Sequence, residues 1–246
     1  MTNQITSLIL VGGLGTRLRS VLPDLPKPMA PVRGRPFLEY LLADLKKAGI
    51  ENVVFCVGHQ AEKIEEHFGD GSRFSLRVEY SRERELLGTA GAMKLAQPLV
   101  ASEDFLLLNG DCYNNVDFQG LLARHRSTPA LATLVAAHLE DRSRFGSLKI
   151  NEDNRVLGFE EKGVATGAGF INAGYYAFSQ QVLDLIPASE VCSLERDIFP
   201  QILEQNAMFA FESQGAFIDI GLPQDWRRAE TLLPELPKIS ENHQGN

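Results

Sequence analysis

The sequence opens its first recognisable element with the stretch ITSLILVGGLGTRL, residues 5–18. Ile5 to Val11 form a short apolar run, which is typical of a strand buried on both faces of a parallel sheet. Glycines follow at positions 12, 13 and 15, and glycine lets the backbone turn sharply and bring successive N–H groups close to a ligand. The spacing matches neither a Walker A motif nor a dinucleotide fingerprint. The stretch alone therefore leaves two interpretations open, a phosphate-binding loop or a tight strand-to-helix turn.

Short apolar runs alternate with amphipathic stretches through the first half of the chain. Phe37 to Leu45 carry a helical apolar stripe that Gly49 ends, and Pro36 is expected as the first residue of that helix. The pattern also predicts helices and strands at further positions: helices over residues 61–68 and 90–99, and strands over residues 53–57, 76–80 and 105–108. Because parallel strands need crossover helices, this alternation predicts an α/β fold, a Rossmann-like three-layer αβα domain around a mostly parallel sheet.

The second half of the chain is less regular. Its patterns predict strands over residues 131–137, 148–159, 170–178 and 216–220, and helices over residues 180–186 and 194–205. We expect antiparallel strands here that extend the same sheet, which makes the sheet mixed. No linker-like shift in composition and no internal repeat divides the chain. We therefore expect a single domain over residues 1–234, followed by a polar, proline-bearing tail over residues 235–246 that is disordered.

Composition argues against several classes of function. The chain has 246 residues, of which 44% are hydrophobic and 23% are charged, as in an ordinary globular protein. Its formal net charge of −8 argues against a broad basic surface for nucleic acid. Cys56, Cys112 and Cys192 lie far apart without zinc-site spacing and are expected to be reduced thiols. We recognise no signal peptide and no membrane-spanning apolar run, so we expect a cytoplasmic protein with no membrane partner.

Lys27 stands in an unusual frame, Pro26-Lys27-Pro28-Met29-Ala30-Pro31. Prolines on both sides restrict the backbone and hold a long, flexible cation in a set position. A lysine that serves only solubility needs no such frame. The alternative is a stiff surface loop with an ordinary lysine, and the segment by itself does not decide between the two.

Two aspartates lie among apolar residues. Asp111 follows the apolar strand at 105–108, where open α/β sheets carry ligand-binding groups. Asp219 stands inside Phe217-Ile218-Asp219-Ile220, and a carboxylate in such surroundings is costly unless it is paired or bound to a metal. Two aspartates at one site would suit Mg²⁺, which prefers oxygen ligands and bridges to phosphates. The alternative is a turn or cap aspartate, which is stronger for Asp111 because Asn-Gly-Asp is turn-like.

Taken together, these motifs resemble those of a known family. A strand, then Gly-Gly-x-Gly-Thr-Arg-Leu, then Pro-Lys-Pro some ten residues later is similar to the signature of the sugar-1-phosphate nucleotidyltransferases. Five further motifs follow in the family's order over nearly the whole chain: LGTAG at 87–91, NGD at 109–111, FEEK at 159–162, NAG at 172–174 and FIDIG at 217–221. The resemblance implies a nucleotide-diphospho-sugar transferase type of fold.

The resemblance also implies a reaction. Such an enzyme joins a nucleoside monophosphate from an NTP to a sugar 1-phosphate and releases pyrophosphate. The sugar phosphate oxygen is already anionic, so catalysis needs positioning and charge neutralisation rather than a strong general base. The chain fits that demand, since we find no pairing of its five histidines with a carboxylate or a cysteine in the sequence.

Residue roles follow from the resemblance, motif by motif. Arg17 would bind the β- and γ-phosphates, and Lys27 would lie between the α-phosphate and the sugar phosphate. Lys162 would hold the sugar phosphate, and Glu161 would accept hydrogen bonds from sugar hydroxyls. The implied site comprises catalytic residues Arg17, Lys27 and Asp111; nucleotide-binding residues Leu10, Gly12, Gly13, Gly15, Thr16, Arg17, Glu83, Gly88 and Thr89; sugar-phosphate-binding residues Gly146, Glu161, Lys162, Asn172 and Gly174; and Mg²⁺ ligands Asp111 and Asp219.

The base and the sugar are less firmly indicated. Guanine presents N1–H and N2–H₂ donors, so Glu83 or Glu85 would suit GTP, although each could equally be an exposed loop charge. The motifs at 12–31, 145–146, 159–162 and 193–200 most resemble the short D-glycero-α-D-manno-heptose 1-phosphate guanylyltransferases. Short mannose 1-phosphate guanylyltransferases come second, and other sugar-1-phosphate uridylyl- or thymidylyltransferases remain alternatives.

Two other classes of protein share parts of these patterns. A non-catalytic regulatory subunit that binds a sugar nucleotide would keep the fold, but the presence of all the charged catalytic and metal-binding candidates argues against it. A cytidylyltransferase acting on polyol or choline phosphate has similar loops, whereas the motifs at 159–162 and 172–174 favour a sugar pocket. Homo-oligomer formation is left open, with the apolar face of residues 194–205 as a candidate interface.

Overall fold

The structure is a computed structural model that describes residues 4–13, 15, 18, 21–160, 164–188 and 190–237. Four site residues of the sequence analysis lie outside these ranges: Thr16, Arg17, Glu161 and Lys162. Of the expected tail, only residues 235–237 are described. There Leu236 packs against the core, and Arg35 donates a hydrogen bond of 2.7 Å to the carbonyl oxygen of Pro237.

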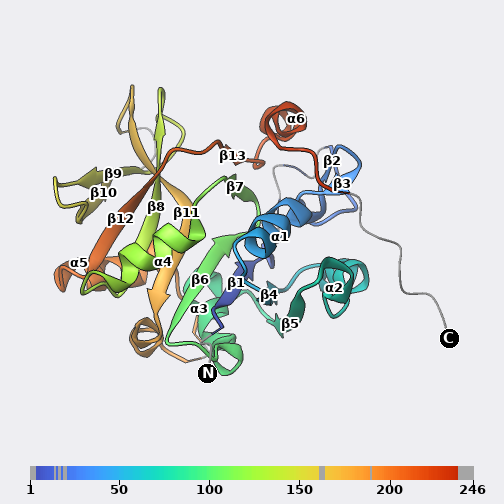
Figure 1. Ribbon diagram of the computed structural model, residues 1–246, viewed down its shortest axis with the longest axis horizontal. Coiled ribbons are helices and arrows are strands. Elements are labelled where there is room, and N and C mark those ends of the chain that lie inside the picture. The colour runs from blue at the N-terminus through green and yellow to red at the C-terminus, as the bar shows by residue number, and fades with distance from the viewer. Residues whose placement is uncertain are drawn as a thin grey trace.

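A mixed sheet forms the centre of the molecule (Figure 1). Its parallel half is built from four strands in the order β5 (Arg77–Arg82), β4 (Asn52–Val57), β1 (Thr6–Leu10) and β6 (Asp104–Asn109). Next to β6 lies β11 (Gly169–Ser179), which runs antiparallel to both of its long neighbours. The sheet continues through β8 (Ala132–Leu139) and β12 (Met208–Ser213), and the hairpin β9 (Ser147–Ile150) and β10 (Val156–Glu160) joins β11 near its start.

Helices cover both faces of this sheet, which confirms the predicted three-layer αβα fold. Side chains alternate along a strand, so Ile9 packs with α1 on one face while the neighbouring Leu8 packs with α3 on the other. One face carries α1 (Leu38–Lys47), α2 (Ala61–Phe68) and α4 (Phe118–Arg126), and the other carries α3 (Gly88–Leu95) and α5 (Phe199–Glu204). Among the described residues, no helix is both long enough and apolar enough to cross a membrane.

Two small strand pairs and a helix lie beyond the carboxyl ends of the parallel strands (Figure 1). Strand β7 (Cys112–Asn114) pairs antiparallel with β13 (Phe217–Asp219), and β2 (Pro31–Val32) pairs with β3 (Arg35–Pro36). Helix α6 (Pro223–Leu232) follows β13, and its Trp226 donates a hydrogen bond of 2.8 Å from Nε1 to the carbonyl oxygen of Pro31. These elements form a cover over one edge of the sheet.

Several predicted helices differ in the structure, and proline explains most of the differences. Pro36 lies in β3 and pairs with Pro31, so α1 begins at Leu38 rather than at Pro36. Residues 90–99 divide into α3 and a 3₁₀ turn at Gln97–Leu99, because Pro98 cannot donate the hydrogen bond that would continue the helix. Residues 180–186 form a 3₁₀ helix, Gln180–Leu185, instead of an α-helix.

The predicted helix over residues 194–205 also divides. It consists of a π-helical turn, Leu194–Ile198, followed by α5, which begins where Pro200 can occupy the first helical turn. Its apolar residues Leu194, Ile198, Phe199 and Ile202 are buried in the core. The apolar face therefore packs inside the molecule, and the suggestion that it is exposed for an interface was wrong.

Glu39 on α1 is a buried carboxylate, with only 4% of the residue exposed. Arg35 donates to Oε2 of Glu39 from both Nε and Nη2, and Nε2 of His67 lies 2.7 Å from Oε1. Burial alone would raise the pKa of Glu39, but the hydrogen bonds to His67 and Arg35 outweigh it and lower that pKa. The sequence analysis paired no histidine with a carboxylate, and this was wrong for two of them. The partner of His67 lies on a different helix, and Nε2 of His125 stands 3.7 Å from Oδ1 of Asp104 in β6.

Replacing Glu39 with Gln is expected to lower the free energy of unfolding at neutral pH by about 2–3 kcal/mol, less than for a fully buried pair because Arg35 and His67 are partly exposed. Since the pKa of Glu39 is lowered in the folded state, its stabilisation is present above the pKa of an unfolded glutamate, about 4.3, and is lost as the pH falls through the folded pKa. Urea unfolding of both proteins across this pH range measures the difference. Glu62→Gln, at an exposed ion pair on α2, is the control and should change stability little. An equal loss at neutral and acidic pH would contradict the role of the Glu39 charge.

Candidate functional site

The glycine loop and the Asn109–Asp111 segment leave the sheet side by side. Strand β1 lies between β4 and β6, and Leu10 is in register with both Cys56 and Asn109. Two backbone hydrogen bonds continue the pairing past the strand ends: Val11 N–H to the carbonyl of Cys56 at 3.0 Å, and Gly110 N–H to the carbonyl of Leu10 at 2.9 Å. The parallel register therefore brings these two loops to the same edge, where open α/β sheets bind ligands.

Asp219 reaches this edge through the β7–β13 pair. Asp219 is in register with Cys112, and the N–H of Ile220 donates to the carbonyl oxygen of Asp111 at 3.0 Å. Below the pair, the buried Tyr175 donates from its hydroxyl to the carbonyl oxygen of Cys112 at 3.1 Å. As a result, one carboxylate oxygen each from Asp111 and Asp219, and the Sγ of Cys112, all lie within 4.8 Å of one another.

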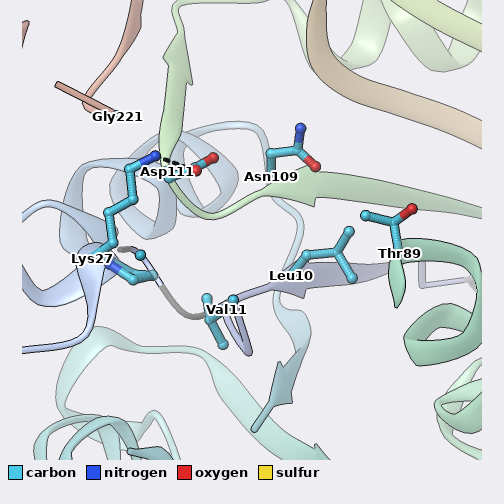
Figure 2. Close-up of a pocket in the computed structure, with 10 residues that line it drawn as sticks. Leu10, Val11, Lys27, Thr89, Asn109, Asp111 and Gly221 are labelled. Atoms are coloured by element: carbon cyan, nitrogen blue, oxygen red, sulfur yellow. Dashed lines mark hydrogen bonds and ion pairs between the residues drawn. The ribbon is translucent and has the colours of Figure 1, made fainter. Parts of the chain in front are cut away.

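Lys27 lies against both carboxylates. It begins a 3₁₀ turn, Lys27–Met29, that Pro26 precedes, and its Nζ donates to Asp111 Oδ2 at 2.5 Å (Figure 2). The same Nζ contacts Asp219 Oδ1 at 3.4 Å. Only 10% of the Lys27 side chain is exposed. Burial alone would lower the pKa of Lys27, but the charges of Asp111 and Asp219 outweigh it and raise that pKa. The lysine is therefore held as an ammonium ion between two acids.

A cavity of about 340 Å³ opens beside this ion pair (Figure 2). Six predicted residues line it: Leu10, Gly13, Gly15, Lys27, Thr89 and Asp111. The sequence analysis missed four others that also line it: Val11, Pro28, Asn109 and Gly221. Each of the four stands inside or next to a quoted motif, so position within the motif was the available signal.

Three predicted nucleotide-binding residues do not belong to the described lining of this cavity: Gly12, Glu83 and Gly88. Glu83 accepts a hydrogen bond of 3.1 Å from Leu87 N–H, and burial raises the pKa of its carboxyl group. A Cβ atom at position 12 would stand 2.7 Å from Oε1 of Glu83 and 3.1 Å from the backbone nitrogen of Gly58, so a larger residue there would have to displace the Glu83 side chain. Glu85, the other candidate for base recognition, is exposed and lines a separate surface hollow.

A second cavity of about 540 Å³ adjoins the first and shares Asn109 with it. The predicted Gly146, Asn172 and Gly174 line this cavity, together with Asp219. Asn172 is fixed in orientation, because its Nδ2 donates to the Tyr176 hydroxyl at 2.8 Å and its Oδ1 accepts from Gly174 N–H at 3.1 Å. The sequence analysis gave no role in the site to seven further residues of its lining: Cys112, Phe145, Phe159, Glu160, Glu195, Arg196 and Phe217.

Gly174 lies against Asn109, the residue that lines both cavities. It has φ +78°, and a Cβ atom there would stand 2.6 Å from Nδ2 of Asn109, so the position excludes larger residues. The junction thus holds one ammonium ion, two carboxylates and a carboxamide, with a glycine-lined cavity on one side and a partly aromatic cavity on the other. This arrangement suits an anionic ligand and a hard cation on one side, and a small polar ligand on the other.

Comparison with known proteins agrees with this geometry. Residues 6–235 match the model of the nucleotidyl transferase family. The chain is 40% identical over 227 residues to the D-glycero-alpha-D-manno-heptose 1-phosphate guanylyltransferase of Aneurinibacillus thermoaerophilus, covering 92% of this chain and 97% of that protein. It is 36% identical over 234 residues to the mannose-1-phosphate guanylyltransferase of Mycobacterium tuberculosis, covering 94% of this chain and 65% of that protein.

A solved structure agrees as well. The crystal structure of HddC from Yersinia pseudotuberculosis complexed with GMP-PN superposes with a TM-score of 0.81 at 33% identity, covering 92% of this chain and 98% of that chain. The family match, the curated relatives and the fold together show that this chain belongs to the nucleotidyl transferase family.

Proposed function

We propose that this protein transfers GMP from GTP to a sugar 1-phosphate and releases pyrophosphate, with D-glycero-α-D-manno-heptose 1-phosphate as the sugar substrate. The observation that carries the proposal is the contact of Lys27 with Asp111 and Asp219 at the junction of two cavities. The similarity to heptose and mannose 1-phosphate guanylyltransferases supports the choice of base and sugar. Mannose 1-phosphate is the second candidate for the sugar substrate.

The first cavity would hold the nucleotide. Gly13 and Gly15 present backbone to the cavity, and N–H groups in such a loop can bind phosphate oxygens. Thr89 lines the same cavity, although its Oγ1 already accepts a hydrogen bond of 2.8 Å from Leu194 N–H. Arg17 and Thr16, outside the described residues, are proposed on the family resemblance alone to bind the β- and γ-phosphates.

Asp111 and Asp219 would hold a divalent cation, which we propose to be Mg²⁺. Their fit is supported by Lys27, whose ammonium group contacts both carboxylates and so marks a place suited to positive charge. Carboxylate oxygens are the ligands that Mg²⁺ prefers. Burial raises the pKa of Cys112, so its thiol stays neutral beside them and is a poor ligand for a hard cation. The cation would neutralise charge on the phosphates.

The residues at the junction suit an in-line displacement. A phosphate oxygen of the sugar substrate attacks the α-phosphorus, the new P–O bond forms, and the bond to the departing pyrophosphate breaks. That oxygen is already anionic, and no histidine stands among the described residues lining either cavity. Lys27 would therefore contribute by neutralising charge between the two phosphates rather than by accepting a proton.

The second cavity would hold the sugar phosphate. Asn172 and Gly146 line it, and Asn172 already has a fixed orientation, which suits selective binding of hydroxyl groups. Glu161 and Lys162, outside the described residues, are proposed on the family resemblance to bind the sugar hydroxyls and the sugar phosphate. The aromatic side chains Phe145, Phe159 and Phe217 would pack against the apolar edges of the sugar ring.

The first experiment is a pyrophosphate-release assay with Mg²⁺, using ATP, CTP, GTP and UTP and a panel of sugar 1-phosphates. We expect the highest kcat/KM with GTP and D-glycero-α-D-manno-heptose 1-phosphate, followed by GTP and mannose 1-phosphate. Release with CTP alone would favour a cytidylyltransferase, and no release with any pair would favour a non-catalytic binding protein. A chelator should abolish release, and added Mg²⁺ should restore it.

Two variants at the junction should lose turnover for different reasons. Lys27→Met and Asp111→Asn are each expected to lower turnover about 100- to 1000-fold, which is the typical cost of removing one preorganised charge. Binding of Mn²⁺ without nucleotide separates them, because Asp111→Asn loses a ligand and should bind the ion more weakly. Lys27→Met keeps both carboxylates and removes the ammonium ion that contacts them, so it should bind Mn²⁺ at least as tightly as wild type.

The matched control for Lys27 is Lys46→Met. Lys46 forms an ion pair of 3.0 Å with Glu51 and lies outside both cavities. It should keep wild-type turnover. Turnover near the wild-type value in Lys27→Met or Asp111→Asn would overturn the role given to that residue.

Recognition of guanine is tested at Glu83. A carboxylate accepts hydrogen bonds from guanine N1–H and N2–H₂, whereas a glutamine replaces one acceptor with a donor. Glu83→Gln is therefore expected to lower kcat/KM for GTP about 10- to 100-fold, as for loss of a charge-assisted hydrogen bond, and to leave kcat/KM for UTP unchanged. The parallel variant Glu85→Gln should leave both unchanged. The opposite pattern would transfer the role to Glu85.

A further inference from the structure

Arg144 and Asp225 form an ion pair outside both cavities. Nη2 of Arg144 lies 2.6 Å from Oδ2 of Asp225, and Nη1 lies 3.4 Å from Oδ1, so the guanidinium contacts both carboxylate oxygens. Asp225 is buried in the first turn of α6, while 46% of the Arg144 side chain is exposed. Neither belongs to the described lining of the two cavities, so the pair lies outside the candidate site.

Each partner lies close in sequence to a segment that lines the second cavity. Arg144 directly precedes Phe145 and Gly146, which form part of the wall of that cavity. Asp225 lies in the first turn of α6, the helix that follows Asp219 at the end of β13 (Figure 1). The ion pair therefore joins the sugar-cavity wall to the segment that carries a proposed metal ligand.

A second contact links the same two segments. The rings of Phe145 and Phe217 meet edge to face, with centroids 5.5 Å apart, and both line the cavity. The Arg144 guanidinium also lies over the Phe145 ring at 5.7 Å, so the arginine contacts the wall residue as well as the acid. Its hydrogen bond to Asp225 raises the pKa of Arg144, and the charge of Asp219 raises it further, so the guanidinium lies within the field of the Asp219 carboxylate.

The other described hydrogen bonds of the loop that connects β8 and β9 do not involve the Asp219 segment. Phe145 N–H bonds to the carbonyl of Arg142 within the loop, and Arg142 N–H bonds to the carbonyl of Gly167 before β11. Asp141 accepts hydrogen bonds from Ser143, again within the loop. The wall is thus tied to the Asp219 segment through Arg144 and Phe145.

We propose that Arg144 and Asp225 are positioning residues for the sugar 1-phosphate: their ion pair holds the Phe145–Gly146 wall at a fixed place relative to Asp219. The proposal rests on the proposed function of the second cavity. Fixing this wall sets where the sugar ring sits, and therefore where its phosphate oxygen stands relative to the nucleotide. A misplacement of about 1 Å can lower a rate about 100-fold, even though a half-exposed ion pair adds little to stability.

The test compares how each substitution changes KM for the sugar 1-phosphate with how it changes KM for GTP. Arg144→Ala and Asp225→Asn should each raise KM for the sugar 1-phosphate about tenfold and leave KM for GTP within about twofold, since the wall belongs to one cavity only. Arg144→Lys keeps the charge but not the two-point contact, so its KM should lie between those of wild type and Arg144→Ala. The double variant should be no worse than either single variant, because both remove the same contact.

Arg126→Ala is the matched control. Arg126 also forms an ion pair with an aspartate, with its Nε 2.8 Å from Asp104 Oδ2, and 50% of its side chain is exposed. Asp104 starts β6, at the end of the strand opposite Asp111, so this variant should keep both KM values. Unchanged KM for the sugar 1-phosphate in Arg144→Ala and Asp225→Asn, or an equal rise for both substrates, would overturn the positioning role.

Hydrogen exchange separates a failure of this inference from a failure of the proposed function. If the wild type turns over no sugar phosphate, the proposed function fails, yet the ion pair can still be tested. Backbone amides of residues 144–147 should exchange faster in Asp225→Asn than in wild type, while those of α4 should not change. Equal exchange in the two proteins would show that the ion pair does not hold the wall, whatever the substrate.

Discussion

The pairing of β13 with β7 is the interaction on which the rest of the candidate site depends. It places Asp219 opposite Cys112, and the bond from Ile220 N–H to the carbonyl of Asp111 extends the ladder by one step. Because side chains alternate along a strand, a slip of one residue would turn Asp219 to the other face of this ribbon. The hydroxyl of the buried Tyr175 donates to the carbonyl oxygen of Cys112 in β7. The buried core therefore supports the register in addition to the pairing of the two short strands.

Charge balance is the second constraint. Two carboxylates close together are unfavourable without a cation, and a buried lysine is unfavourable without an anion. The contact of Lys27 with Asp111 and Asp219 satisfies both needs at once. The prolines around Lys27 keep the ammonium ion near the acids, so the local charge arrangement is set before any substrate arrives. A chain with a net charge of −8 thereby presents a positive group where anionic substrates would bind.

The elements that could be predicted from the sequence are those with a strong local period. The predicted helix at 61–68 matches α2, and the apolar runs around Ile9 and Leu107 correspond to β1 and β6. Six helices and strands were missed: β2, β3, β7, α4, β12 and α6. Strand β7 has only three residues, too few for any periodic pattern, and its partner is far away in the sequence.

For the same reason, the site could be predicted only in part. The family resemblance implied that Asp111 and Asp219 lie at one site. The residue patterns alone indicated only that each aspartate stands in unusually apolar surroundings. Asn109, which borders both cavities, was quoted within a motif but given no role. The Arg144–Asp225 pair had no signal in the sequence, because an ion pair across the fold leaves no local pattern. The roles of Thr16, Arg17, Glu161 and Lys162 stay predictions.

Strand β11, antiparallel between β6 and β8, has a consequence for how such a protein can diverge. The glycine-lined cavity draws mainly on the parallel half of the sheet, whereas the second cavity draws mainly on β10, β11, the π-helical turn and β13. Substitutions in the lining of one cavity can therefore leave most of the backbone around the other cavity in place. If the two cavities hold the nucleotide and the sugar phosphate as proposed, selection can act on acceptor preference separately from donor preference.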